Sequence, residues 1–349
     1  MANHEREQAD ALRIGLYMVN QHPPGADMRA TLAEQVDLLH AARDGGWDSV
    51  WAGHHYLSTG MQMLHPVPFL AYVVREAGEM ALGTAILLLT IENPVAIAEA
   101  FATIDVMCDG RLSLGAGLGY RDVEFDAFGV DRSERVRRFT ENLELIKRLW
   151  SGESVDADLP WCRLEGARPG VLPVQRPRPP VWMGATGERA VRRAARMADG
   201  WLVNPATRLD AVEAQLPAYR EAREDSGRAD GRPRIAAIRE VFCAADRDRA
   251  LEASRPYLEE KYRAYASWGQ ANALTDTDTL ALDYEQLAEQ RFIVGSPEDC
   301  YAGLREYRDR IGAEELILRC HWPGMPIDAA VECVQLLSSE VLPTLRQTS

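Results

Sequence analysis

The stretch PPVWMGATGERAVRRAARMADGWLV, residues 179–203, contains a complete strand–helix–strand unit. The apolar run at 181–185 predicts a strand, 188–197 predicts a helix, and 200–203 predicts a second strand. Uninterrupted apolar runs of this kind are typical of parallel sheets, because helices cover both faces of such sheets. The unit therefore predicts an α/β protein.

The same alternation continues along the whole chain. Eight strand candidates alternate with helices, which favours a (β/α)8 TIM barrel with insertions over the competing doubly wound open sheet. The other strands are expected at 13–18, 50–51, 82–89, 112–114, 234–242 and 316–319. Helices are expected at 28–43, after Pro94, at 133–149 with Ser133 as N-cap, at 210–223, at 298–311 after Pro297, and at 327–342.

The chain is longer than a minimal barrel. It has 349 residues, whereas a typical barrel of this type needs about 250. Two long interruptions explain the excess, one at 151–180, rich in Pro and Arg, and one at 244–292, which contains the polar run QANALTDTDT. We therefore expect a single domain over 1–349 with two excursions.

Composition narrows the class of protein. Hydrophobic residues make up 46% of the chain and the formal net charge is −14, a balance that disfavours nucleic acid and anionic membrane surfaces as partners. No apolar run is long enough to span a membrane, and residues 1–13 lack the apolar core of a signal peptide, so we expect a soluble, cytoplasmic protein. The six cysteines form no C-x-x-C pair and are expected to be reduced thiols rather than a zinc site.

Polar residues that directly follow strands are the candidates for chemistry, because barrel enzymes place their active sites at the carboxyl ends of the strands. His54 and His55 follow the strand SVWAG. Side chains alternate along a strand, so one imidazole should face the barrel axis and the other the helix layer or a loop. This arrangement disfavours a shared metal ion. Either an acid–base role or a structural role fits the imidazole at the mouth.

Two glycine-containing segments also follow strands. GAGLGY at 115–120 lacks the last glycine of the dinucleotide fingerprint, so it indicates either a simple turn or a close approach of backbone to a ligand. GATGERAV at 184–191 leads directly into a helix, where free amides at Thr186, Gly187 and Glu188 would suit a phosphate. The alternative for this segment is an ordinary N-cap at Thr186.

A third position lies after the last strand, where Cys320, His321 and Trp322 either line a pocket or simply pack. Motifs of serine hydrolases, P-loop proteins, zinc proteases and EF-hands are absent from the sequence.

With these segments in place, the chain resembles the bacterial luciferase-like superfamily of flavin-dependent monooxygenases and related oxidoreductases. The segments that carry the resemblance are GWDSVWAGHHY, LGTAILLLTIENPVAIAEAFATIDVMCDGRLSLGAGLGY, EFDAFGVDRSERVRRFTENLELIKRLW, PPVWMGATGERAVRRAARMADGW, VGSPEDC and WPGMP. The resemblance implies a barrel that binds reduced FMN, or in a sister branch the deazaflavin coenzyme F420, at the carboxyl ends of its strands.

The resemblance also implies roles for particular residues. His54 matches the catalytic histidine near the flavin, and His55 matches its neighbour. Ala85 and Ile86 match the position of a non-proline cis peptide bond beneath the flavin ring. The loops that hold the flavin phosphate match the following residues: Gly117, Leu118, Gly119, Tyr120, Ala185, Thr186 and Gly187.

The chain departs from luciferase at three positions. Gly53 replaces an acidic residue, Leu118 replaces an arginine near the phosphate, and Gly117 stands at the reactive thiol position. Aldehyde-dependent light emission is therefore not implied, and a compensating role for Arg121 at the phosphate stays open.

These observations predict a two-component monooxygenase in which a separate NAD(P)H-dependent reductase supplies reduced FMN, and O₂ then oxygenates a small-molecule substrate. The alternative is a coenzyme F420-dependent oxidoreductase that transfers hydride on the same barrel. We also expect a homodimer. The polar segment at 268–283 is interpreted either as a lid over the site or as a surface insertion without a gating role.

Overall fold

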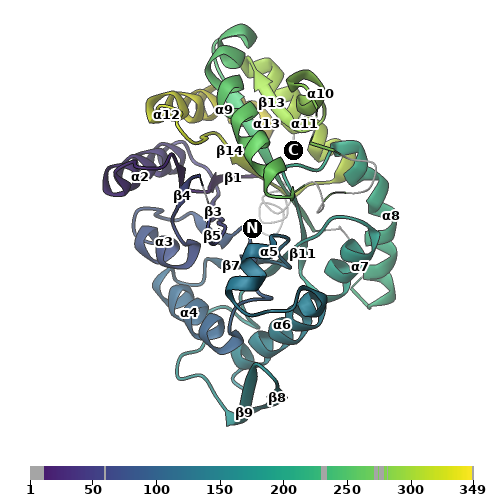
Figure 1. Cartoon of the computed structure of the whole chain (residues 1–349). Coiled ribbons are helices and arrows are strands. Elements are labelled where there is room, and N and C mark those ends of the chain that lie inside the picture. Colours follow the sequence, from purple (N-terminus) through teal and green to yellow (C-terminus); the bar gives the residue numbers. More distant parts are fainter. Residues whose placement is uncertain are drawn as a thin grey trace.

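The computed structural model describes residues 12–58, 60–228, 234–270, 274, 279–280 and 282–347. Eight parallel strands close into a barrel in the order β1-β3-β5-β7-β10-β11-β12-β14, and β14 pairs with β1. Figure 1 looks into this barrel, with the helices arranged around it. The strands are β1 (Arg13–Met18), β3 (Ser49–Ala52), β5 (Ala81–Thr84), β7 (Leu112–Gly117), β10 (Val181–Gly184), β11 (Gly200–Val203), β12 (Ile235–Cys243) and β14 (Glu315–Arg319). The predicted (β/α)8 barrel is confirmed.

One principal helix follows each barrel strand and covers its outer face (Figure 1). These helices are α2 (Met28–Asp44), α3 (Pro66–Val73), α4 (Pro94–Met107), α6 (Arg135–Ser151), α7 (Glu188–Met197), α8 (Leu209–Asp225), α11 (Pro297–Ile311) and α12 (Ile327–Leu336). Ser296 caps α11 with a reciprocal capping box, and Pro297 occupies its first turn as expected.

Further elements decorate the barrel. The short strands β2 (Gln21–His22) and β4 (Gln62–Met63) pair with each other, and α5 (Asp122–Ala127) follows β7. A hairpin of β8 (Val155–Leu159) and β9 (Cys162–Ala167) occupies the first excursion and projects beyond α4 and α6 in Figure 1. The second excursion contains α9 (Arg247–Ser267), α10 (Tyr284–Ala288) and the beginning of β13 (Phe292–Gly295), which pairs with β12.

Three predicted element boundaries are wrong. The expected continuous strand at 82–89 is divided into β5 and β6 (Leu87–Leu88), because a cis peptide bond between Ala85 and Ile86 interrupts it. Ser133 does not cap α6: it lies within a 3₁₀ turn, Arg132–Glu134, whose N-cap is the Asp131 carboxylate. The last helix does not end at 342, since a π-helical turn, Leu337–Val341, connects α12 to α13 (Leu342–Gln347).

The barrel interior is a packed apolar core rather than a pore. Trp51 and Trp182 meet edge to face inside it, with ring centroids 6.3 Å apart, and the buried side chains of Leu202, Ile238 and Ile317 belong to the same cluster. Such packing closes the barrel below its mouth. The barrel interior therefore leaves no room for a ligand between the strands.

Gly115 and Gly117 on β7 allow the neighbouring β5–β6 segment to approach closely. A Cβ atom at residue 115 would lie 1.8 Å from the backbone oxygen of Thr84, whereas one at 117 would meet the movable Cδ1 of Ile86 at 2.0 Å. We expect Gly115→Ala to lower the free energy of unfolding by about 3 kcal/mol, and Gly117→Ala to have a smaller effect. Urea denaturation of both variants measures this difference. Equal losses would contradict the backbone clash at 115.

Candidate functional site

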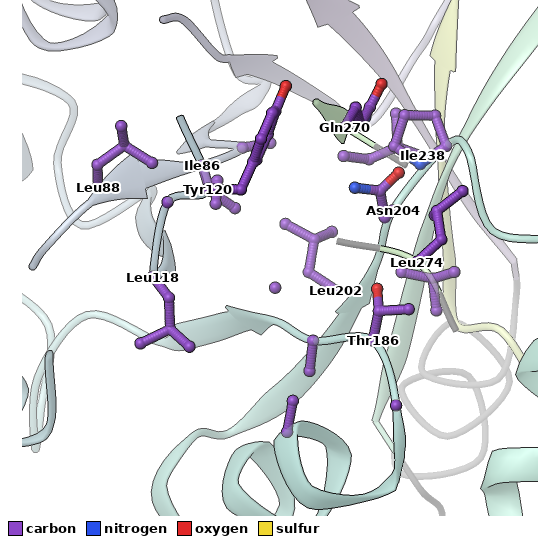
Figure 2. Close-up of a pocket in the computed structure, with 18 of the residues that line it drawn as sticks. Ile86, Leu88, Leu118, Tyr120, Thr186, Leu202, Asn204, Ile238, Gln270 and Leu274 are labelled. Carbon is purple, nitrogen blue, oxygen red and sulfur yellow. The ribbon is translucent and has the colours of Figure 1, made fainter. Parts of the chain in front are cut away.

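A cavity of about 860 Å³ opens at the carboxyl ends of the strands (Figure 2). Its size lies within the range of small-molecule and cofactor sites. The sequence-predicted residues that line it are His54, His55, Ala85, Ile86, Leu118, Gly119, Tyr120, Ala185, Thr186 and Gly187. Gly117 does not line it, because the side chain of Ile86 fills the space beside that glycine.

The cis peptide bond between Ala85 and Ile86 lies at the position that the family resemblance implies. The hydroxyl group of Tyr17, on β1, donates a hydrogen bond to the carbonyl oxygen of Ala85. Ala85, Ile86 and Tyr17 all line the cavity, so this segment forms part of its wall. Their contact with a flavin or deazaflavin ring stays a prediction.

His54 is a buried, neutral imidazole beside the cavity. His54 is 7% exposed. The centroid of its ring lies 4.5 Å from the ring centroid of Tyr56 and 4.5 Å from that of His65. Burial lowers the pKa of His54 to about 3, with smaller contributions from His65 and His55. Within the described residues, neither ring nitrogen has a hydrogen-bond partner. Both nitrogens are also almost fully buried, and an unpartnered buried imidazole in a cavity wall is a candidate for a functional contact.

The lowered pKa of His54 predicts a stability change with pH. His54 takes up a proton near pH 6.5 in the unfolded chain and only near pH 3 in the folded chain. The contribution of neutral His54 to the free energy of unfolding is therefore complete above pH 6.5 and is lost as the pH falls toward 3. At pH 5 the loss is about 2 kcal/mol. We expect His54→Leu to remove this part of the change, which urea denaturation at pH 7 and pH 5 measures. An unchanged difference between the two pH values would contradict a neutral His54.

His55 is held on both sides of its ring. Its Nδ1 lies 3.1 Å from Oε1 of the buried Glu124, and its Nε2 lies 3.2 Å from the hydroxyl oxygen of Tyr120. The carboxylate accepts a hydrogen bond, so Nδ1 carries the proton and the Tyr120 hydroxyl donates to Nε2. Both histidines line the cavity, but their rings have different surroundings. His54 packs against Tyr56 and His65, whereas His55 packs against Tyr120. That one of the two faces the barrel axis stays a prediction.

The loop before α7 offers fewer free amides than the sequence indicated. The amide of Gly187 donates to Oε1 of Gln215, at 2.7 Å, and is not available to a phosphate. Gly187, with φ of 81°, is also the N-cap residue, so Thr186 is not the cap. The amides of Glu188 and Arg189 begin the helix and have no carbonyl one turn earlier. Figure 2 shows the Thr186 side chain at the cavity.

Four arginines that the sequence analysis did not single out surround this end of the cavity: Arg132, Arg135, Arg189 and Arg193. Arg132 forms an ion pair with Asp122, at 2.6 Å. Within the described residues, the other three arginines form no ion pair. Burial, and then the nearby charge of Arg135, lowers the pKa of Arg193. The Glu188 carboxylate is turned along the helix toward Arg192, at 2.8 Å. This end therefore carries an excess of positive charge.

Arg121 does not supply a phosphate contact. It is buried, it binds the carbonyl oxygens of Tyr56 and Leu57, and its guanidinium lies 4.5 Å from the ring centroid of Trp268. His321 and Trp322 also lie outside the cavity wall. The indole nitrogen of Trp322 donates to Glu240, so the packing interpretation holds for this segment.

The opposite wall comes from residues that sequence reasoning missed. Lys261 and Tyr265 on α9, Gln270 after it, and Arg319 at the end of β14 line the cavity. Helical periodicity alone placed no side chain of 244–292 at the site, because it does not say which barrel face an inserted helix covers. Of the suggested lid, 271–273, 275–278 and 281 lie outside the described residues, so the lid stays a prediction.

Neither a metal site nor a membrane helix emerges from the described residues. Among them, no three His, Cys, Asp or Glu side chains are placed to hold a metal ion. None of their helices is both long enough and apolar enough to cross a bilayer.

A barrel with a non-proline cis peptide bond and paired histidines at its mouth is the architecture that the sequence resemblance implied. The model of the luciferase-like monooxygenase family matches residues 12–314. The chain therefore belongs to this family, whose members include enzymes that use FMN and enzymes that use F420.

An F420-dependent dehydrogenase and a monooxygenase are among the relatives that are similar to this chain. An F420-dependent glucose-6-phosphate dehydrogenase of Nakamurella multipartita is 30% identical over 326 residues, covering 90% of this chain and 93% of the relative. The 4-hydroxyprotoasukamycin monooxygenase of Streptomyces nodosus subsp. asukaensis is 24% identical, covering 87% and 84%. Among solved structures, monooxygenase RslO1 from Streptomyces bottropensis has a TM-score of 0.85 at 24% identity, covering 95% and 99%, which establishes the shared fold.

Proposed function

We propose that this protein is an oxidoreductase that uses coenzyme F420 to exchange a hydride with a small organic substrate. This reverses the order of the two functions expected from the sequence, where FMN-dependent oxygenation came first. The proposal is supported by the 30% identity to an F420-dependent dehydrogenase along 90% of the chain. The single structural observation that carries it is the group of arginines at one end of the cavity.

The charge at this end suits F420 better than FMN. FMN carries one phosphate group, whereas F420 carries a phosphodiester followed by a chain of glutamate carboxylates. Arg135, Arg189 and Arg193, with the first amides of α7, offer more cationic donors than one phosphate needs. Arg135 and Arg193 are half-buried and Arg189 is exposed, so water solvates them in part, and an anion close by would still be attracted to all three. A longer anionic tail provides more such anions.

The other end of the site fits hydride transfer. Bound F420 supplies a ring carbon that accepts or returns a hydride. His54 is neutral, buried and without a partner within the described residues, so its imidazole can accept the hydrogen bond of a substrate hydroxyl and take its proton as the hydride leaves. The cavity wall of Ile86, Leu88, Leu118 and Leu202 excludes water from the reacting atoms.

An anaerobic titration tests the coenzyme assignment. We expect the protein to bind F420 tightly and FMN at least tenfold more weakly, measured by the change in absorption or fluorescence of each coenzyme. Exclusive binding of FMN would overturn the proposal. If reduced FMN binds and is then oxidised by O₂ with oxygenation of a substrate, the monooxygenase function is the correct one, and it requires the separate reductase.

A further inference from the structure

The cavity has a second charged end, opposite the arginines. In the eight-strand order, β14 and β1 lie four positions away from β7 and β10, so these pairs face each other across the barrel. The arginine end follows β7 and β10, while Arg319 ends β14 and Lys261 reaches the same wall from α9. A coenzyme held by its tail at the arginines leaves this far wall to the substrate.

The far wall contains a buried cluster with an excess positive charge. Lys261, Arg319 and Glu240 are 3%, 2% and 0% exposed. The ammonium group of Lys261 donates to Oε1 of Glu240, and Nε of Arg319 lies 4.0 Å from Oε2 of the same carboxylate. One carboxylate therefore serves two cations. A buried cation without a full counter-charge is costly, which favours a site that is completed by an anion.

The remaining hydrogen bonds hold the cluster rigid without adding negative charge. Arg319 donates from Nη2 to Oε1 of Gln21, at 2.6 Å, and from Nε to the carbonyl oxygen of His321, at 3.0 Å. The indole of Trp322 donates to Oε2 of Glu240, which is the same oxygen that faces Nε of Arg319. Burial opposes ionisation of Glu240, but the charges of Lys261 and Arg319 keep its pKa below the ordinary value.

The surfaces beside the cluster are apolar and aromatic. Tyr17, Tyr120 and Tyr265 line the cavity, and Ile238 and Leu274 lie together on one side of it in Figure 2. Burial raises the pKa of Tyr17 and Tyr120, so both phenols stay neutral. A ligand with one negative charge on a flat, apolar body matches this combination of surfaces.

We propose that Lys261 and Arg319 form a substrate subsite that binds a singly charged oxygen anion, such as a carboxylate, on a flat organic substrate. This deepens the proposed function by naming the substrate class. It rests on the cavity and not on the identity of the coenzyme, so it can be tested on the protein without coenzyme.

Benzoate and its neutral analogue benzamide are suitable probes, with isothermal titration calorimetry as the measurement. We expect the wild-type protein to bind benzoate about tenfold more tightly than benzamide, because a charge-assisted contact contributes that much. Lys261→Met should remove this preference, while Arg193→Ala, at the other end, should retain it. Equal binding of the two probes by the wild type, or loss of benzoate binding in Arg193→Ala alone, would overturn the subsite.

A measurement on the wild type covers the case in which Lys261→Met does not fold. Burial lowers the pKa of Lys261 to about 8, Glu240 opposes this shift, and Arg319 adds to it. The groups that face the ammonium are Glu240 on β12, Arg319 on β14, and Tyr262 and Tyr265 on α9. Burial raises the pKa of both phenols, so they remain neutral. Benzoate affinity should therefore fall above pH 8, and a constant affinity up to pH 10 would contradict the subsite.

F420 titration of Lys261→Met separates the two proposals. We expect this variant to bind F420 as the wild type does, because the coenzyme tail lies at the other end. If it loses F420 together with benzoate, the lysine serves the coenzyme and the substrate subsite is refuted. Failure of F420 to bind the wild type would refute the coenzyme assignment and leave the benzoate result unaffected.

Discussion

His54→Ala should lower the turnover number by about 10² to 10⁴-fold, because the variant lacks the group that takes the substrate proton during hydride transfer. The imidazole it removes is neutral above about pH 4, since burial lowers its pKa to about 3. The measurement is the loss of visible absorption of oxidised F420 with the alcohol that the wild-type protein oxidises fastest, or the gain of that absorption from reduced F420 with the aldehyde that it reduces fastest.

Two comparisons identify the cause of such a loss. The dissociation constant of F420 should change little in His54→Ala, because the tail contacts are at the other end of the cavity. His55→Gln should lower turnover less, since both nitrogens of His55 are already bonded, to Glu124 and Tyr120. A rate unchanged in His54→Ala, or a larger loss in His55→Gln, would assign the proton transfer to another group.

The double variant Arg135→Ala, Arg193→Ala should weaken F420 binding by about 100-fold and FMN binding by about tenfold. Each guanidinium contributes a charge-assisted contact that is worth roughly a factor of ten in affinity. The effect on FMN is smaller because FMN has fewer anionic groups for the two arginines to contact. Fluorescence titration of both coenzymes measures the two constants. Raising the salt concentration should weaken F420 binding more in the wild type than in the double variant.

Arg196→Ala is the matched control for this prediction. Arg196 lies on α7 like Arg193, but it is exposed and does not line the cavity. Its replacement removes the same charge from the same helix and should leave the affinity for F420 within about twofold of wild type. An equal effect of Arg196→Ala would mean that the net charge of the helix matters rather than contact with the tail.

Local sequence patterns predicted the barrel correctly, because the strand and helix periods are properties of neighbouring residues. The run at 200–203 is β11, and 188–197 is α7. Some boundaries were wrong because the backbone departs locally from the regular period. The strand expected at 82–89 is broken at Ala85–Ile86. Ser133 lies in a 3₁₀ turn that the Asp131 carboxylate caps, and α6 begins after this turn, at Arg135.

The mouth residues were predictable for a related reason. In a barrel, a polar residue directly after a strand faces the ligand side, and this placed His54, His55 and residues 185–187 at the cavity. What these residues bond to was not predictable. Gln215 is 28 positions from Gly187 and takes its amide, and Glu124 is 69 positions from His55 and fixes its tautomer.

By itself, the sequence determined the alternation of strands and helices, the family, and the end of the barrel that carries the site. Only the tertiary structure decided where the charges gather. Arg135 and Arg193 come from two helices, and Lys261 reaches Glu240 and Arg319 from an inserted helix. Periodicity reports the buried face of each element, whereas electrostatic clusters arise between elements that folding brings together.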